Sequence, residues 1–196
     1  MSTVKVAVVQ AASVLFDKAA SVKKACQLIT DAGRGGAQLV LLPEAFIPAY
    51  PRGFSFGMKV GSRNDQGRAL WQRYWDNSID TNGPEVQQLA EAAASAGVFL
   101  CIGVIEKDGR SAGETLYCSM LYFSPEGKLI GKHRKLKPTG SERLIWGEGD
   151  GSTLPVFSTE FGKIGGLICW ENYMPLARMA LYGQGVEIYL APTADS

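Results

Sequence analysis

Apolar residues in this chain fall into short β-branched runs that alternate with longer stretches at helical spacing. The run at 4–9 predicts a buried strand. Apolar positions between 17 and 32 recur on one face of a helix. A second buried strand is expected at 38–42, where Pro43 ends it. Strand, helix and strand over this length predict a right-handed crossover within one sheet.

The rest of the chain continues this alternation after a loop at 45–64 that is rich in proline, glycine and aromatic residues. Helices are predicted at 67–75, 82–96 and 175–182. Strands are predicted at 98–105, 115–123, 128–134, 163–168 and 186–190. Turn signals at 107–110 and 124–127 join the middle strands into an antiparallel meander, and 136–153 is expected to be a loop.

The composition is that of a globular protein without a strong electrostatic field. The chain has 196 residues, enough for one domain with a real core. Lys and Arg number 20 against 19 Asp and Glu, so neither nucleic acid nor an acidic membrane is an expected partner. The N-terminus lacks a secretory signal, and no apolar run approaches the roughly 18 residues of a membrane helix. We therefore expect a cytoplasmic enzyme or domain.

The cysteines are widely spaced, at Cys26, Cys101, Cys118 and Cys169. No C-x-x-C pair occurs and the chain has 1 His, so no metal site is expected. An even number of cysteines permits disulfides, but reduced thiols are favoured for a cytoplasmic chain.

Cys169 is the candidate nucleophile because it directly follows the buried apolar run at 164–168. A thiol held at the end of a strand can face a pocket, although a buried cysteine more often acts as a small hydrophobe. To attack near neutral pH, the thiol needs a basic or cationic neighbour.

Two charged residues at strand ends are candidates for that neighbour. Glu44 follows a buried strand and can act as general base, or can merely cap a turn. Lys135 follows the strand at 128–134 and can stabilise an anionic intermediate, or can belong to a solvated basic run. His133 shares a side with Lys135, yet a lone histidine is more often structural. The run 132–137 also resembles a nuclear-import or RNA-binding patch, which its position between strands disfavours.

Three separated motifs together resemble the nitrilase family of carbon-nitrogen hydrolases. They are Leu-Pro-Glu-Ala-Phe at 42–46, His-Arg-Lys-Leu-Lys-Pro-Thr at 133–139 and Cys-Trp-Glu-Asn at 169–172. The resemblance implies an α/β fold, the four-layer αββα sandwich. It also implies Glu44 as general base, Lys135 as stabilising cation and Cys169 as nucleophile, with assistance from Glu142. No metal or organic cofactor is implied.

The Cys-Trp-Glu-Asn motif resembles the nitrilase branch, which implies hydrolysis of a nitrile to a carboxylic acid and ammonia. Cyanide hydratases and dihydratases share much of this pattern, and an amide product or an amidase or carbamoylase activity is an alternative. Aromatic residues near the motifs, Trp170, Tyr50 and Tyr173, are candidate contacts for a small-molecule nitrile substrate.

The resemblance covers only the N-terminal portion of family members, through the strand after Cys169. We expect one carbon-nitrogen hydrolase domain at 1–196 whose C-terminal part is missing, and hence an incomplete second sheet. The family resemblance implies a homo-oligomer if the fold is complete. A catalytically inactive truncated chain that co-assembles with full-length subunits is the alternative from a different class.

Overall fold

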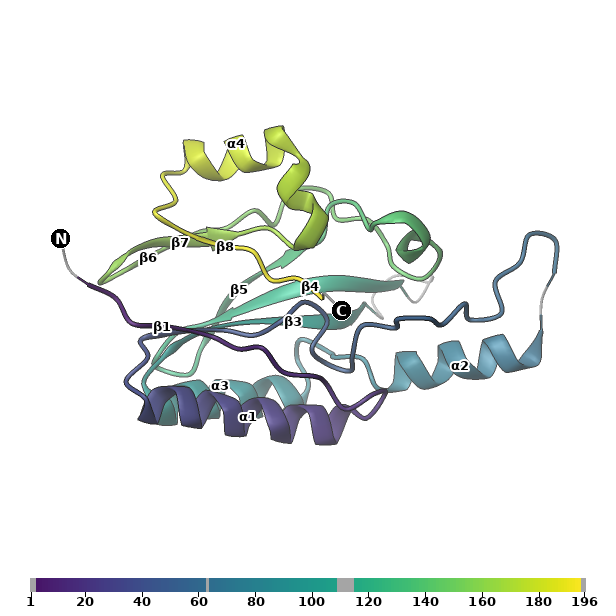
Figure 1. The fold of residues 1–196 in the computed structure, drawn as a ribbon, viewed down its shortest axis with the longest axis horizontal. Coiled ribbons are helices and arrows are strands. Elements are labelled where there is room, and N and C mark those ends of the chain that lie inside the picture. The colour runs from purple at the N-terminus through teal and green to yellow at the C-terminus, as the bar shows by residue number, and fades with distance from the viewer. Residues whose placement is uncertain (1–2, 63, 109–114, 195–196) are drawn as a thin grey trace.

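Four layers of secondary structure, α, β, β and α, make up the computed structural model of this chain (Figure 1). The structure describes residues 3–62, 64–108 and 115–194. The described residues form a larger sheet of five strands and a smaller sheet of three strands. Helices α1 and α3 cover the outer face of the larger sheet, and α4 covers that of the smaller one (Figure 1).

The larger sheet combines a parallel half with an antiparallel half. Its strands are β1 (Val6–Val8), β2 (Leu39–Leu41), β3 (Phe99–Asp108), β4 (Thr115–Phe123) and β5 (Leu129–Arg134), in that spatial order. β1, β2 and β3 are parallel, whereas β3, β4 and β5 form an antiparallel meander. The crossover from β1 to β2 and the antiparallel meander were expected, whereas the parallel pairing of β2 with β3 was not predicted.

The helices form where their end signals predict. Helix α1 (Lys18–Arg34) begins at Asp17, whose carboxylate accepts from the backbone N of Ala20 at 2.9 Å. Helix α2 (Asp65–Asp76) is capped in the same way by Asn64. Helix α3 (Pro84–Ala96) has proline in its first turn and ends at left-handed Gly97. Helix α4 (Pro175–Gly183) also starts with proline.

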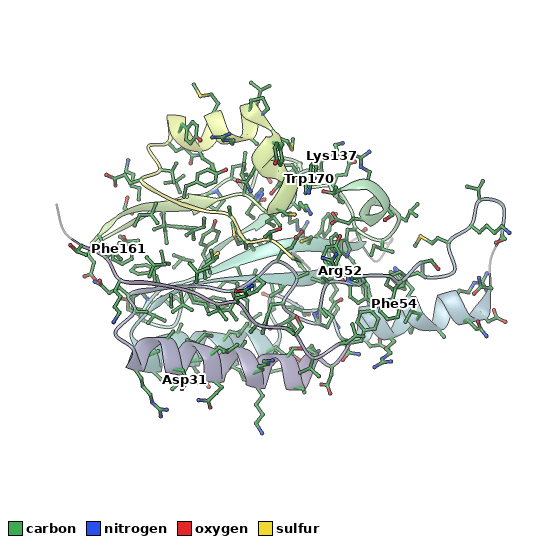
Figure 2. The ribbon with its side chains drawn as sticks, in the orientation of Figure 1. Asp31, Arg52, Phe54, Lys137, Phe161 and Trp170 are labelled. Atoms are coloured by element: carbon green, nitrogen blue, oxygen red, sulfur yellow. The ribbon has the colours of Figure 1, made fainter. Side chains whose placement is uncertain are left out.

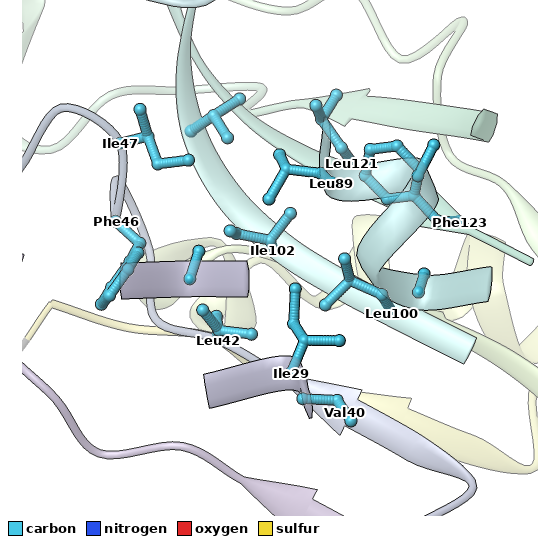
Figure 3. Close-up of a cluster of buried hydrophobic side chains, with 14 of the residues drawn as sticks. Ile29, Val40, Leu42, Phe46, Ile47, Leu89, Leu100, Ile102, Leu121 and Phe123 are labelled. Atoms are coloured by element: carbon cyan, nitrogen blue, oxygen red, sulfur yellow. The ribbon is translucent and has the colours of Figure 1, made fainter. Parts of the chain in front are cut away.

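Among the described residues, a small apolar cluster packs α4 on the smaller sheet, and two larger ones hold the sheets in place. One lies between the larger sheet and helices α1 and α3 (Figure 3), where its members include Ile29, Val40, Leu89, Leu100, Ile102 and Leu121. The other lies between the sheets, where its members include Leu39, Cys101, Met120, Tyr122, Ile164 and Ile168. The smaller sheet has the order β6 (Val156–Thr159), β7 (Gly162–Gly166) and β8 (Ile188–Leu190).

Most predicted elements are present with small shifts at their ends. Sequence analysis assigned no element to β6, and it treated 136–153 as loop, where the 3-10 turn η1 (Gly140–Leu144) lies. The strand predicted at 163–168 ends earlier, and a 3-10 turn η2 (Cys169–Tyr173) follows it. Residues 107 and 108 belong to β3, while the rest of the turn predicted at 107–110 lies outside the described residues.

The prediction of burial for the first strand is wrong. Val6 and Val8 remain 38% and 74% exposed. Among the described residues β1 is an edge strand that pairs only with β2, and both valines are exposed to solvent. Val6 and Val8 therefore form a strand, as β-branched residues favour, but their side chains lie outside the core.

Other broad expectations can be compared directly with the structure. Among residues 3–62, 64–108 and 115–194, no helix combines the length and apolar character needed to cross a membrane. Cys26, Cys101, Cys118 and Cys169 are all free thiols, as expected.

Gly103 in the middle of β3 permits a close approach that positions Glu44. A Cβ atom there would lie 2.4 Å from the Pro43 oxygen and 2.5 Å from the Cα atom of Glu44. The same backbone is bonded to β3, since Phe46 N donates to the Gly103 oxygen at 2.8 Å. The segment after β2 therefore lies directly on the larger sheet, where any side chain at 103 would displace it.

Substitution of Gly103→Ala is expected to lower the free energy of unfolding by about 1–3 kcal/mol through overpacking. Gly183→Ala is the matched control, because a Cβ atom at this exposed helix end meets nothing within 4 Å. That control should change stability by less than about 1 kcal/mol. Chemical denaturation measures both variants, and equal stabilities would contradict the role of the close approach.

Candidate active site

Glu44 lies in the segment that follows β2 and is almost completely buried. Its Oε1 accepts from the Lys135 ammonium at 2.6 Å and from the Cys118 thiol at 3.5 Å. Its Oε2 accepts from the backbone N of Ala194 at 3.0 Å. One oxygen is therefore engaged by the cation, while the other faces the segment at 191–194.

Lys135 follows β5 on the side that faces the smaller sheet, and it is fully buried. Its Nζ lies 2.6 Å from Glu44 and 2.9 Å from Glu142. Burial by itself lowers the pKa of Lys135, but neighbouring Cys118, Glu44 and Glu142 favour the ammonium more strongly and raise the pKa overall. Lys135 is therefore a permanently charged group between two carboxylates.

Glu142 holds this ammonium from the second side. It lies in η1, where its Oε2 also accepts from the backbone N of Thr139 at 2.6 Å. Its Oε1 accepts from the Tyr50 hydroxyl at 2.6 Å. Burial and the bonded Glu142 carboxylate both raise the pKa of Tyr50, so the hydroxyl keeps its proton and donates. With both oxygens occupied, Glu142 is suited to hold Lys135 in place.

Cys169 starts the turn that follows β7 and has a left-handed backbone with φ 51°. This conformation is unusual for a residue with a side chain and turns the thiol sharply out of the strand direction. Its backbone N donates to the Pro192 oxygen at 2.9 Å. Asn172 fixes the same turn by donating to the carbonyl oxygens of Cys169 and Leu167.

Two consecutive residues after β8 connect the thiol to the carboxylate. Thr193 Oγ1 donates to the Cys169 Sγ at 3.0 Å, and Ala194 N donates to Glu44 Oε2 at 3.0 Å. The half-buried thiol consequently shares one short segment with the buried ion pair. The structure thus brings together Glu44, Lys135, Glu142 and Cys169, which lie on separate elements.

The surroundings of Cys169 favour a neutral thiol in the resting state. Burial raises the pKa of Cys169, and the negative charge of Glu44 raises it further. The Thr193 hydroxyl and the Lys135 charge act in the opposite direction but do not outweigh these effects. A thiol of this kind needs a base to take its proton as it attacks.

A cavity of about 690 Å³ adjoins this cluster. Its lining residues include Leu41, Leu42, Glu44, Tyr50, Arg52 and Thr193. Two of these residues belong to the buried cluster or contact it. Glu44 is part of the cluster, and Thr193 donates to the Cys169 thiol. Arg52 lies at its wall, where the guanidinium donates to the Ala194 oxygen at 3.0 Å (Figure 2).

The three predicted substrate contacts lie in different surroundings. Tyr50 is part of the cavity wall and bonds Glu142. Trp170 and Tyr173 are 61% and 78% exposed, and their ring centroids are 5.0 Å apart. Contact of these two rings with a substrate stays a prediction.

Every basic residue in the run 132–137 has a carboxylate partner. Lys132 and Arg134 bond Glu106, Lys137 bonds Glu148, and His133 bonds Glu171. Lys135 bonds Glu44 and Glu142 as described above. Paired charges leave little positive potential for a nucleic acid, and they agree with the structural reading of this run.

Sequence reasoning did not find Thr193, Ala194 or the bonding role of Glu171. Their contacts join segments separated by 24, 150 and 35 residues, respectively. Nothing local in the sequence indicates such contacts. For Glu171, the one available signal was a charged residue inside the Cys-Trp-Glu-Asn motif at 169–172.

Comparison with known proteins shows the family of this chain. The family model described as carbon-nitrogen hydrolase matches residues 5–196. This chain belongs to the carbon-nitrogen hydrolase family. It is 55% identical to nitrilase 3 of Arabidopsis thaliana over 99% of the chain and 55% of that protein. It is 53% identical to a bifunctional nitrilase/nitrile hydratase of Lupinus angustifolius, over 99% of the chain and 54% of that protein.

Solved structures confirm the predicted αββα fold class. An amidase from Nesterenkonia sp. matches with a TM-score of 0.74 and 19% identity, over 98% of this chain and 65% of that one. Identity at this level shows the fold alone. The chain spans about half the length of the curated relatives that it matches.

Replacing Glu44→Gln is expected to lower the pKa of Cys169, because the Glu44 charge is one of the effects that raise it. Alkylation of the thiol should then become faster at neutral pH. The measurement is the rate of reaction with iodoacetamide against pH, in a Cys26→Ala background that removes the other half-buried cysteine.

Glu148→Gln is the matched control, because this exposed glutamate bonds the exposed Lys137 at the surface. It should leave the alkylation profile unchanged. A Glu44→Gln profile that is unshifted or moved to higher pH would contradict the electrostatic coupling between Glu44 and Cys169.

Proposed function

We propose that this chain carries the catalytic centre of a nitrile-hydrolysing enzyme, with Cys169 as nucleophile and Glu44 as base. One observation carries the proposal: the thiol is joined through residues 193 and 194 to a buried carboxylate that is paired with an ammonium. A base, a fixed cation and a neutral thiol are the groups that addition to a weak electrophile requires. The similarity to plant nitrilases supports a nitrile as the substrate.

The first half of the reaction converts the nitrile into a covalent intermediate. Glu44 takes the thiol proton while sulfur adds to the nitrile carbon, and the nitrogen gains a proton to give a thioimidate. The Lys135 ammonium stabilises the negative charge that develops during addition. Because the pKa of Cys169 is raised, proton transfer and attack are expected to occur together.

The second half consumes two waters. Glu44 activates the first water, which adds to the thioimidate carbon, and ammonia leaves to give a thioester. A second water then attacks the thioester, which releases the carboxylic acid and restores the thiol. Glu142 contributes by holding Lys135, since both of its oxygens accept hydrogen bonds in the site. No step requires a group that this chain does not supply.

An amide is the second candidate product. If the tetrahedral intermediate expels the thiol instead of ammonia, an amide leaves after one water. The similarity to proteins named bifunctional nitrilase/nitrile hydratase favours this alternative over the amidase and carbamoylase reactions. The cytoplasmic location and the homo-oligomeric state remain predictions.

The decisive measurement is the release of ammonia and amide from a panel of nitriles, cyanide and amides. Cys169→Ala is expected to reduce every product at least about a thousandfold, since removal of a covalent nucleophile abolishes its pathway. Cys26→Ala, in a half-buried cysteine on α1, should retain activity within about twofold.

Each outcome of the panel has a distinct meaning. Ammonia from nitriles that depends on Cys169 supports the nitrilase, whereas amide without ammonia supports the hydratase. A preference for amides over nitriles would favour an amidase. Absence of turnover by folded chain would overturn the enzyme proposal and favour the inactive, co-assembling chain.

A further inference from the structure

The Glu171 carboxylate is buried at the point where the two sheets meet. The residue is 1% exposed and lies two positions after Cys169 in η2. Its oxygens face donors from both sides of the molecule. They accept from Ile168 N at 2.7 Å, from Leu136 N at 2.5 Å and from His133 Nε2 at 3.0 Å.

Two of these three donors belong to residues on either side of Lys135 in the sequence. His133 precedes Lys135 by two residues, and Leu136 follows it directly. The larger sheet supplies both donors through β5 and the residues after it. Glu171 and Cys169 instead come from the turn after β7 in the smaller sheet. One carboxylate therefore links the strand end that carries the cation to the turn that carries the nucleophile.

His133 completes this link from within the larger sheet. The ring is fully buried, with Nε2 facing Glu171 and Nδ1 facing the Thr153 carbonyl oxygen. Both ring nitrogens thus face acceptors. An imidazolium donates to both, whereas either neutral tautomer leaves one nitrogen lone pair facing an oxygen. The ring thus lies between the Glu171 carboxylate and the Thr153 carbonyl oxygen.

We propose that Glu171 and His133 form a positioning pair that sets the Lys135 ammonium relative to the Cys169 thiol. This inference rests on the proposed function, in which Lys135 stabilises charge that develops next to Cys169. Neither member of the pair touches the reacting atoms. A displacement of Lys135 by a fraction of an ångström weakens transition-state stabilisation more than substrate binding, so the pair acts on kcat.

A simple turn cap is the competing explanation. It accounts for the bond from Ile168 N to Glu171, which stays within one turn. It does not account for Leu136 and His133, which approach the same carboxylate across 35 and 38 residues. Because a cap would affect folding alone, the two explanations differ in kinetics and in the signals of the histidine ring.

The kinetic test compares Glu171→Gln with the matched control Glu148→Gln. The amide that replaces the Glu171 carboxylate would offer one acceptor oxygen to three donors, so kcat per folded molecule should fall by about tenfold or more. KM should stay within about twofold, since the substitution leaves the cavity wall intact. Glu148 bonds the exposed Lys137, and its variant should leave both constants unchanged. A Glu171→Gln enzyme with unchanged kcat would overturn the proposal.

A second pair of variants covers the case in which Glu171→Gln does not fold. His133→Ala removes the ring donor but keeps the backbone contacts of Glu171. We expect it to lower kcat at constant KM, and we expect His133→Gln, which keeps an amide donor, to recover most of the loss. Equal kcat values for His133→Ala and the unmodified chain would overturn the role of the pair.

The spectroscopic test needs no turnover, so it separates this inference from the proposed function. The chain has 1 His, so its ring signals in nitrogen NMR are assigned directly. Because Nε2 faces the Glu171 carboxylate, Glu171→Gln should shift the Nε2 signal while Glu148→Gln should not. An unshifted Nε2 signal would overturn the pair even if the chain hydrolyses nitriles. Absence of turnover beside the expected shift would reject the enzyme proposal alone.

Discussion

The buried ammonium of Lys135 between Glu44 and Glu142 is the interaction on which the site depends. Two carboxylates this close would repel each other, and each buried charge costs several kcal/mol of hydration. The lysine offsets both effects because it stands between them at hydrogen-bond distance from each. Strands of the larger sheet and the turn η1 must therefore keep these side chains together for the charges to be tolerated.

The same cluster determines the protonation of Cys169, the candidate nucleophile. Burial and the Glu44 charge raise the pKa of the Cys169 thiol more than the Thr193 hydroxyl and the Lys135 charge lower it. The resting thiol therefore keeps its proton, and in the proposed mechanism that proton passes to Glu44 during attack. In the same proposal, charge develops on the substrate, where the buried Lys135 ammonium needs no reorganisation to stabilise it.

Backbone geometry places the two halves of this chemistry on different sheets. The left-handed Cys169 leaves the smaller sheet, whereas Glu44 and Lys135 follow strands of the larger one. The close packing of Gly103 against the Glu44 segment fixes one side of the site. Residues 193 and 194 join the sides at the thiol and the base. Catalytic geometry is consequently a property of how the sheets pack.

The sequence by itself determined the elements and the chemical types in this protein. Periodicity, proline and glycine located most helices and strands, because those signals act within a few residues. Cys169, Glu44 and Lys135 could be singled out because each is a reactive or charged residue at the end of a predicted strand. Tertiary structure alone decided that β1 is exposed, that Thr193 and Ala194 link thiol and base, and that Glu171 bonds across the sheets. The physical reason is that burial and long-range hydrogen bonds depend on how the layers pack, which local patterns do not encode.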